Sequence, residues 1–243
     1  MYAIEARGLT KRFGAKVAVD GLDLQVPAGE MLALLGVNGA GKTTTIRMLS
    51  CLSAPTAGEC RICGRSCREE AAQVKGLIGL SPQDTAVAEN LTVAENLHFM
   101  ARVYGLDRAV ALERVRETLA LMGLEEVENQ RSKTLSGGWK RRLSIAMALI
   151  GQPQVLFLDE PTLGLDVLAR REMWRVIRGL KGRMTILLTT HYMEEAEALA
   201  DRIAVMLSGR LAAIGTLAEL EEKTGKTGLE EAFVALAEGG AKA

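Results

Sequence analysis

The stretch MLALLGVNGAGKTTTIRML, residues 31–49, decides the fold of this 243-residue chain. It opens with the uninterrupted apolar run Met31–Leu35, which has the composition of a parallel strand buried on both faces. A glycine-rich loop follows the strand, and a helix is expected over Lys42–Leu49. Strand, loop and helix in this order predict one unit of a parallel α/β sheet.

The loop itself, GVNGAGKT over Gly36–Thr43, has the spacing G-x-x-x-x-G-K-[ST]. Glycines allow backbone N–H groups to converge on phosphate oxygens, and the start of the following helix adds partial positive charge. Lys42 is expected to reach the β- and γ-phosphates of a nucleotide, and the Thr43 hydroxyl to ligate Mg²⁺. The predicted nucleotide-binding residues here are Asn38, Gly39, Ala40, Gly41, Lys42, Thr43 and Thr44.

A second stretch, VLFLDE over Val155–Glu160, predicts another buried strand, Val155–Leu158. Asp159 follows at the carboxyl end of that strand, where open α/β sheets bind their ligands. It is placed to hold Mg²⁺ through water, and Glu160 is a candidate general base for an attacking water. An isolated Asp-Glu pair would more simply cap a strand, but the phosphate loop upstream favours hydrolysis.

The remaining pattern is a parallel α/β chain interrupted by helices. Alternating apolar residues predict antiparallel strands over Tyr2–Leu9 and Val17–Val26. Residues 84–150 have helical spacing throughout, with helices expected over Leu91–Tyr104 and Ala109–Met122. Further on we expect strands Met184–Thr189, Arg202–Leu207 and Arg210–Ile214, helices Ala169–Leu180 and Met193–Ala200, and two short helices in the tail.

Between the two nucleotide motifs lies LSGGW, Leu135–Trp139, and the three motifs in this order resemble the ATP-binding cassette (ABC) ATPases. The resemblance covers nearly the whole chain. It implies a P-loop NTPase, RecA-like α/β core with an antiparallel β subdomain and an all-helical insertion carrying the signature motif. We therefore expect a single ABC ATPase domain, with residues 1–83 and 151–215 as the core, 84–150 as the insertion and 216–243 as a helical tail.

The resemblance also implies roles for four residues outside these motifs. Phe13 matches the aromatic residue that stacks on adenine, and Gln83 the glutamine that joins core to insertion and contacts Mg²⁺ and the reacting water. Asp166 matches the aspartate loop, and His191 the switch histidine that contacts the γ-phosphate. Each residue alone has a plainer interpretation, as packing or turn residue, and only their joint order supports these roles.

The chain departs from the family pattern at four positions. Trp139 replaces the usual glutamine of the signature, Val37 a common proline of the phosphate loop, and Leu163 and Val167 residues that are commonly small and proline. None of these changes removes a ligand or the base. The effect of these four changes on the rate of ATP hydrolysis and on the affinity of the dimer does not follow from the sequence.

The signature residues Ser136, Gly137 and Gly138 can form a second phosphate-binding nest at a helix start. The helix from about Trp139 to Ile150 would span roughly 18 Å at 1.5 Å per residue, and its far end leads back to the Asp159 strand. The signature should therefore lie away from its own phosphate loop. A second copy packed head to tail would bring the two together, which is how the family uses ATP to join two subunits.

Charge and hydropathy indicate which partners the chain has. Lys+Arg and Asp+Glu are both 30, and aromatic residues are 4%, which argues against nucleic acid as a partner. MYAIEARGLT has no apolar leader, and no stretch approaches the ~18–20 apolar residues of a membrane span. We expect a cytoplasmic protein, peripheral on the cytoplasmic face of the membrane, that works with a separate transmembrane permease and with a second copy or a homologous ATPase subunit.

The segments Leu91–Leu97, Tyr104–Leu106 and Leu229–Phe233 resemble the branch that exports drugs, lipids, polysaccharides or ions, so export is favoured. Three alternatives stay open at this point. They are an importer ATPase, a soluble ATPase such as that of iron–sulfur cluster assembly, and a binding module without catalysis. Retention of Lys42, Glu160 and His191 argues against the last.

Four cysteines do not belong to any of these motifs. Cys60, Cys63 and Cys67 read C-x2-C-x3-C, and Cys51 precedes them, so a metal site has to be considered. No second Cys/His pair follows at zinc-ligand spacing. A cytosolic chain also disfavours a disulfide framework. We therefore predict metal-free cysteines, with Cys60 and Cys63 as small apolar fillers in a strand over Glu59–Cys63.

Overall fold

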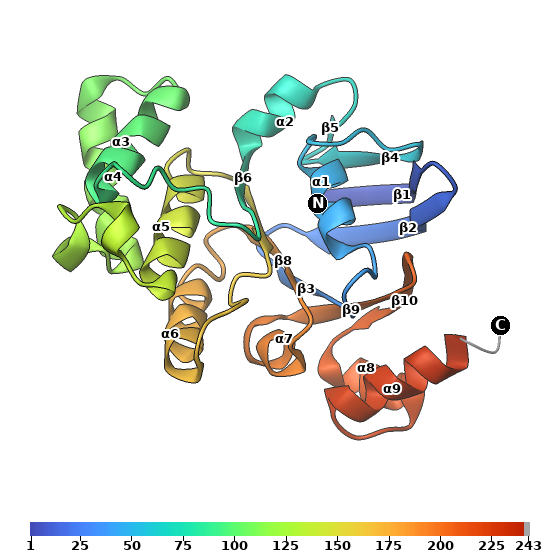
Figure 1. Cartoon of the computed structure of the whole chain (residues 1–243). Coiled ribbons are helices and arrows are strands. Elements are labelled where there is room, and N and C mark those ends of the chain that lie inside the picture. The colour runs from blue at the N-terminus through green and yellow to red at the C-terminus, as the bar shows by residue number, and fades with distance from the viewer. Residues whose placement is uncertain (241–243) are drawn as a thin grey trace.

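The computed structural model describes residues 1–240, which form two β-sheets and the helices around them (Figure 1). The strands are β1 (Tyr2–Phe13), β2 (Lys16–Pro27), β3 (Met31–Leu35), β4 (Ala57–Ile62), β5 (Arg65–Ser66), β6 (Ile78–Ser81), β7 (Val155–Asp159), β8 (Thr185–Thr190), β9 (Arg202–Leu207) and β10 (Arg210–Gly215). The helices are α1 (Lys42–Leu49), α2 (Ala71–Leu77), α3 (Val93–Val103), α4 (Arg108–Met122), α5 (Gly137–Leu149), α6 (Val167–Arg178), α7 (Met193–Leu199), α8 (Leu217–Thr224) and α9 (Leu229–Gly240).

The larger sheet has six strands in the order β10-β9-β3-β8-β7-β6. β3 pairs in parallel with β8 and β9, β7 pairs in parallel with β8 and β6, and only β10 runs antiparallel to its neighbour. Every residue of β3, β7 and β8 is buried, as their apolar sequences require. Because parallel strands end at one edge, the segments that follow β3, β6, β7 and β8 come together there.

The smaller sheet has four antiparallel strands in the order β2-β1-β4-β5. Helix α1 packs between the two sheets, because its apolar residues share one hydrophobic core with β1, β2, β4 and one face of β3. The other face of β3 belongs to a second core, together with α3 to α7 and the tail. Figure 1 shows the smaller sheet and the helices α3, α4 and α5 on opposite sides of the larger sheet.

The segment between β6 and β7 contains the helices α3, α4 and α5, and two short 3₁₀ helices, Glu125–Val127 and Ser132–Thr134, lie between α4 and α5. Local sequence sets where these helices begin. Thr92 and Glu95 form a reciprocal capping box at the start of α3, and Asp107 caps α4. Ser136 caps α5, which is the helix of the signature motif.

The predicted fold class is confirmed, and several predicted boundaries need correction. β4 ends at Ile62 rather than Cys63, which lies in a turn with φ of 50° and is half-exposed rather than a buried filler. The signature helix starts at Gly137, two residues before Trp139, because Ser136 provides the cap. Helix α2 and strand β6 were not predicted, and the last three residues of the expected tail lie outside the described residues.

Within residues 1–240, none of the helices combines the length and the apolar character that crossing a membrane requires.

Candidate nucleotide site

A cleft of about 420 Å³ lies at the carboxyl edge of the parallel strands, where the phosphate loop leaves β3. It collects residues from segments far apart in the sequence, as expected for this edge of the sheet. The lining residues are Phe13, Lys16, Ala18, Asn38, Gly39, Ala40, Gly41, Lys42, Thr43, Thr44, Gln83, Glu160, Leu163 and His191. The cleft therefore brings together the predicted phosphate loop, Phe13, Gln83, Glu160 and His191.

Two glycines show why the loop needs its composition. Gly41 has φ of 105°, and a Cβ there would lie 2.4 Å from the carbonyl oxygen of Ala18. A Cβ on Gly36 would lie 2.5 Å from the carbonyl oxygen of Met206 on β9. Because neither position has room for a side chain, glycine is needed for the loop backbone to close onto the start of α1, where backbone N–H groups can bind an anion.

Lys42 and Glu160 form a buried ion pair in the floor of the cleft. Lys42 Nζ lies 3.1 Å from Glu160 Oε1, and the side chains are only 5% and 6% exposed. Lys42 also donates to the carbonyl oxygen of Gly36 at 2.7 Å. His191 Nδ1 lies 2.8 Å from the other oxygen, Glu160 Oε2. The Glu160 carboxylate therefore stands between a cation and a hydrogen-bonding imidazole.

The backbone at Glu160 is held in an unusual conformation. Its φ is 50°, a left-handed value that L-residues adopt at a cost. The Glu160 N–H donates to the carbonyl oxygen of Thr189 at 3.2 Å and to its hydroxyl at 3.0 Å. These bonds to β8 stabilise a turn that directs the carboxylate away from the strand and into the cleft.

Asp159 is buried beside Thr43 at the end of β7. Its Oδ1 accepts hydrogen bonds from Thr189 Oγ1 at 2.6 Å and from Thr43 Oγ1 at 3.1 Å. A hydroxyl and a carboxylate so close together are the oxygen ligands that Mg²⁺ prefers, and both residues adjoin the phosphate loop. The donor set therefore fits a magnesium ion bound together with nucleotide phosphates.

Gln83 follows β6 and lines the cleft. Its position depends on Arg141, which was not predicted from the sequence. Arg141 of α5 is 5% exposed and donates to the carbonyl oxygens of Pro82, at 2.7 Å, and Gln83. Burial lowers the pKa of this guanidinium, while Asp159, Asp84 and Glu195 oppose that shift. Arg141 thus links the signature helix to the Gln83 loop, and nothing in the sequence distinguishes it from the neighbouring Arg142.

A second buried polar residue behind the cleft also escaped sequence reasoning. Glu195 of α7 is fully buried, and its Oε1 accepts hydrogen bonds from Thr162 Oγ1 at 2.7 Å and Trp174 Nε1 at 3.0 Å. Burial is the main reason that the pKa of Glu195 is raised. The carboxyl joins the segment after Glu160 to α6 and α7, so it supports the backbone on which the cleft residues lie.

Phe13 lies at the end of β1 with 56% of its surface exposed, although it borders the cleft. Lys11 Nζ lies 5.2 Å from the centre of its ring. An exposed aromatic ring beside a phosphate loop is available for stacking on a nucleotide base. Lys16, Ala18 and Leu163 line the same cleft and were not predicted as site residues.

The signature residues and Asp166 do not line this cleft. Ser136 Oγ accepts from the Trp139 N–H at 3.5 Å, at the start of α5. Gly137 and Gly138 face Leu165 and Ala169, because a Cβ on each would lie 3.9 and 3.6 Å from those side chains. Asp166 caps α6 by accepting from the N–H groups of Leu168 and Ala169, each at 2.9 Å. These predicted site residues form a separate group on the same chain.

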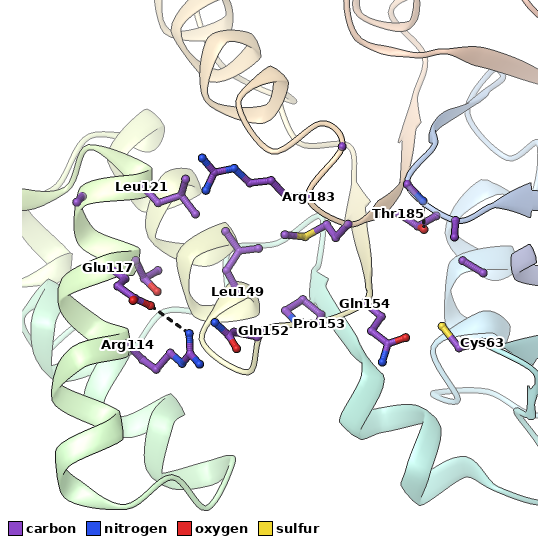
Figure 2. Close-up of a pocket in the computed structure, with 17 residues that line it drawn as sticks. Cys63, Arg114, Glu117, Leu121, Leu149, Gln152, Pro153, Gln154, Arg183 and Thr185 are labelled. Atoms are coloured by element: carbon purple, nitrogen blue, oxygen red, sulfur yellow. Dashed lines mark hydrogen bonds and ion pairs between the residues drawn. The ribbon is translucent and has the colours of Figure 1, made fainter. Parts of the chain in front are cut away.

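A larger cavity of about 1100 Å³ lies near the opposite ends of the strands (Figure 2). Gln154 and Thr185, which line it, precede or begin β7 and β8, and Figure 2 shows the Arg114–Glu117 ion pair of α4 on its other side. None of the predicted site residues lines this cavity. Since ligands of open α/β sheets bind at the carboxyl ends, the smaller cleft is the candidate site.

Comparison with known proteins identifies the family. The sequence profile of the ABC transporter family matches residues 19–163, which is more than half of the chain. The chain belongs to the ABC transporter ATPases. It is therefore an ATP-hydrolysing subunit, and the resemblance expected from the motif order is confirmed.

Relatives of this ABC ATPase include proteins named for drug resistance, Nod factor export and phospholipid transport. It is 46% identical to the daunorubicin/doxorubicin resistance ATP-binding protein DrrA of Streptomyces peucetius over 92% of this chain and 68% of that protein. It is 46% identical to the Nod factor export ATP-binding protein I of Burkholderia lata over 87% of this chain and 70% of the other. It is also 45% identical to the human phospholipid-transporting ATPase ABCA3 over 86% of this chain, but spans only 12% of that protein.

Solved structures agree with this assignment. An ATP-binding subunit of an ABC transporter superposes with a TM-score of 0.85 at 31% identity, covering 96% of this chain and 99% of the other. A dimeric ATP-binding cassette in a post-hydrolysis state, bound to ADP and Pi, superposes with a TM-score of 0.78 at 25% identity, covering 88% and 98%.

Proposed function

We propose that this ABC ATPase binds ATP–Mg in the 420 Å³ cleft, pairs head to tail with a second ATPase subunit, and drives export through a separate membrane-spanning permease. The observation that carries the proposal is the separation of two groups on one chain. Lys42, Glu160 and His191 meet in the cleft, while Ser136–Gly138 lie outside its lining.

Each residue of the cleft would have a distinct task. Phe13 would stack on the adenine, and the loop N–H groups with Lys42 would bind the phosphates. Thr43, Asp159 and Gln83 would hold Mg²⁺, which neutralises charge on the phosphate oxygens. Glu160 would accept the proton of the attacking water, with Gln83 positioning that water and His191 contacting the γ-phosphate.

The contacts of Lys42 suggest how binding and catalysis are linked. Glu160 and a γ-phosphate would compete for the same ammonium group, since both are anions and Lys42 Nζ already lies 3.1 Å from Glu160. A phosphate that takes over Lys42 would free Glu160 Oε1 to accept a proton from water. His191, 2.8 Å from Oε2, would keep the carboxylate in place during this exchange.

The signature completes the site only if a second subunit supplies it. Ser136 and the glycines after it stand at the N-terminus of α5, where N–H groups and helix dipole favour an anion. Asp166 lies beside them at the start of α6 and would contact the partner's nucleotide across the same interface. Both subunits would then contribute to each of two ATP sites.

Export and a separate permease are supported by the relatives. Two of them are named for drug resistance and Nod factor export, and both are described as ATP-binding proteins. We propose that this chain likewise acts peripherally at the cytoplasmic face of the membrane, paired with an identical or homologous ATPase subunit. Residues 1–83 with 151–215 would form the core, 84–150 the insertion, and 216–243 the tail of one domain.

Mixing two damaged subunits tests the head-to-tail arrangement. One subunit carries Lys42→Ala and the other Ser136→Arg, and ATP turnover is measured before and after mixing. If the signature serves the partner's nucleotide, a mixed dimer has one site with both defects and one intact site. Turnover should therefore recover in part.

A complementary control uses a double variant, which carries both substitutions on one polypeptide. This double variant is mixed in excess with wild-type protein. Action between subunits predicts that this double variant damages both sites of a mixed dimer and lowers turnover. No recovery in the first mixture, once mixed dimers have been shown to form, would contradict the arrangement.

A further inference from the structure

Three of the four cysteines lie together at the end of the phosphate-loop helix. In the antiparallel β4–β5 pair, Arg61 faces Ser66 and Ile62 faces Arg65, so the same register places Cys60 opposite Cys67. The Cys67 N–H donates to the Cys60 carbonyl oxygen at 3.0 Å. Hydrogen-bonded pairs of this kind have Cα atoms about 5.5 Å apart, within the range that a disulfide bridges.

Both thiols point toward the last turn of α1. Cys60 Sγ lies 3.9 Å from the carbonyl oxygen of Met48, and Cys67 Sγ lies 3.6 Å from that of Leu49. These carbonyls belong to the end of the helix, where intrahelical donors run out. Cys51, just after the helix, donates its thiol to the Cys67 carbonyl oxygen at 3.2 Å.

The two facing thiols differ in acidity. The pKa of Cys60 is lowered, mainly because the Cys67 thiol hydrogen-bonds to it, although burial acts in the opposite direction. The pKa of Cys67 is raised by the same hydrogen bond and by burial. The shared hydrogen bond thus favours Cys60 as the thiol of this pair that reacts first. Among residues 1–240 no group of three or more His, Cys, Asp or Glu side chains is arranged to hold a metal ion.

We propose that Cys60 and Cys67 form a redox-active pair, which a peroxide converts to a disulfide and a thiol reductant restores, and which thereby adjusts ATP binding at the other end of α1. The Cys60 thiolate attacks a peroxide oxygen, the O–O bond breaks, and the sulfur becomes a sulfenic acid. Cys67 then attacks the Cys60 sulfur, the S–O bond breaks, and hydroxide leaves with the Cys67 proton as water. In total, two thiols and one hydrogen peroxide give one disulfide and two waters.

Helix α1 connects this pair to the nucleotide cleft. It begins at Lys42, whose Nζ contacts Glu160, and ends at Leu49, whose carbonyl oxygen accepts the Cys67 thiol. A disulfide removes both S–H donors from the last turn and fixes the two sulfurs to each other instead. Because α1 is only eight residues long and buries five of them, Lys42, Thr45, Ile46, Met48 and Leu49, a shift at its end is expected to move Lys42 and the adjoining Thr43 as well. The disulfide should therefore weaken ATP binding several-fold.

Peptide mapping and nucleotide titration on the full chain test both parts of the proposal. The protein is treated with hydrogen peroxide, remaining thiols are alkylated, and the linked tryptic peptides are identified. Cleavage after Arg47, Arg61, Arg65 and Arg68 puts Cys63 and Cys67 on separate peptides but leaves Cys51 and Cys60 together on residues 48–61. A Cys51→Ala variant leaves Cys60 as the only cysteine on this peptide and so shows which of the two is linked. The dissociation constant of ATP is measured before oxidation, after it, and after dithiothreitol.

We expect peptide 66–68 to be linked to peptide 48–61 in wild type and in Cys51→Ala, with ATP binding several-fold weaker until dithiothreitol restores it. Cys63→Ala is the matched control, since Cys63 lines the larger cavity in Figure 2, and it should behave as wild type. Cys60→Ala and Cys67→Ala should retain their ATP affinity after peroxide. Linkage through Cys51 or Cys63, no linkage, or an unchanged ATP affinity in the linked wild-type protein would overturn the proposal.

Discussion

Lys42 Nζ lies 3.1 Å from Glu160 Oε1, and this ion pair joins the phosphate loop after β3 to the end of β7. The two residues are far apart in the sequence, and the parallel order β3-β8-β7 brings them together at one edge of the sheet. Both side chains are almost completely buried, so each charge depends on the other and on nearby polar groups. Binding of phosphate and activation of water are therefore expected to be coupled through this pair.

Replacing Glu160 by glutamine should stop hydrolysis and leave binding in place. Glutamine preserves the size of the side chain but cannot accept the proton of water, so ATP turnover should fall by roughly 10²–10⁴-fold. Turnover and ATP affinity are measured on the same preparation. Glu194→Gln, on an exposed position of α7, is the matched control and should keep its turnover. Near wild-type turnover in Glu160→Gln would remove Glu160 from the role of base.

Lys42→Ala should weaken the binding of ATP. Losing a charged hydrogen bond to phosphate typically costs about 1.5–3 kcal/mol, which corresponds to roughly 10- to 150-fold in affinity. The change is measured by titration with ATP–Mg. Lys75→Ala removes a lysine from an exposed position of α2 and should bind as wild type does. Equal affinity in Lys42→Ala and wild type would contradict the proposed contact.

The cysteines should carry no metal in the purified protein. Cys63 lies in the turn after β4, while the Cys60 and Cys67 thiols point to carbonyl oxygens of α1, so the four sulfurs do not converge on one point. Elemental analysis of protein purified without chelators should find zinc and iron well below one ion per chain. One ion per chain that is lost on replacing Cys60 or Cys67 would show a metal site instead.

Sequence alone predicted the parts of this fold that depend on local pattern. The strands Met31–Leu35 and Val155–Leu158 are continuous apolar runs. The loop between β3 and α1 has a glycine and lysine spacing that is typical of phosphate-binding loops. These features can be read from neighbouring residues. The pattern therefore predicted which strand ends carry the nucleotide motifs.

Other parts depend on pairing at long range and could not be predicted in this way. β6 is four residues long and contains Gly79, and it becomes a strand because it pairs with β7, which follows about seventy residues later in the sequence. Arg141 was missed for a similar reason. Its importance comes from the Pro82 and Gln83 carbonyls on another segment, and a basic residue in a helix gives no sign of such partners.

In the proposed function, ATP joins two subunits through the signature of one and the phosphate loop of the other. Sedimentation velocity of the Glu160→Gln protein tests it most directly, because bound ATP is then not consumed. We expect a monomer without nucleotide, a dimer with ATP–Mg, and a monomer again when Ser136→Arg is added to Glu160→Gln. A Glu160→Gln protein that binds ATP and remains monomeric, or that dimerises equally well with Ser136→Arg, would show that the signature does not join the two subunits through ATP.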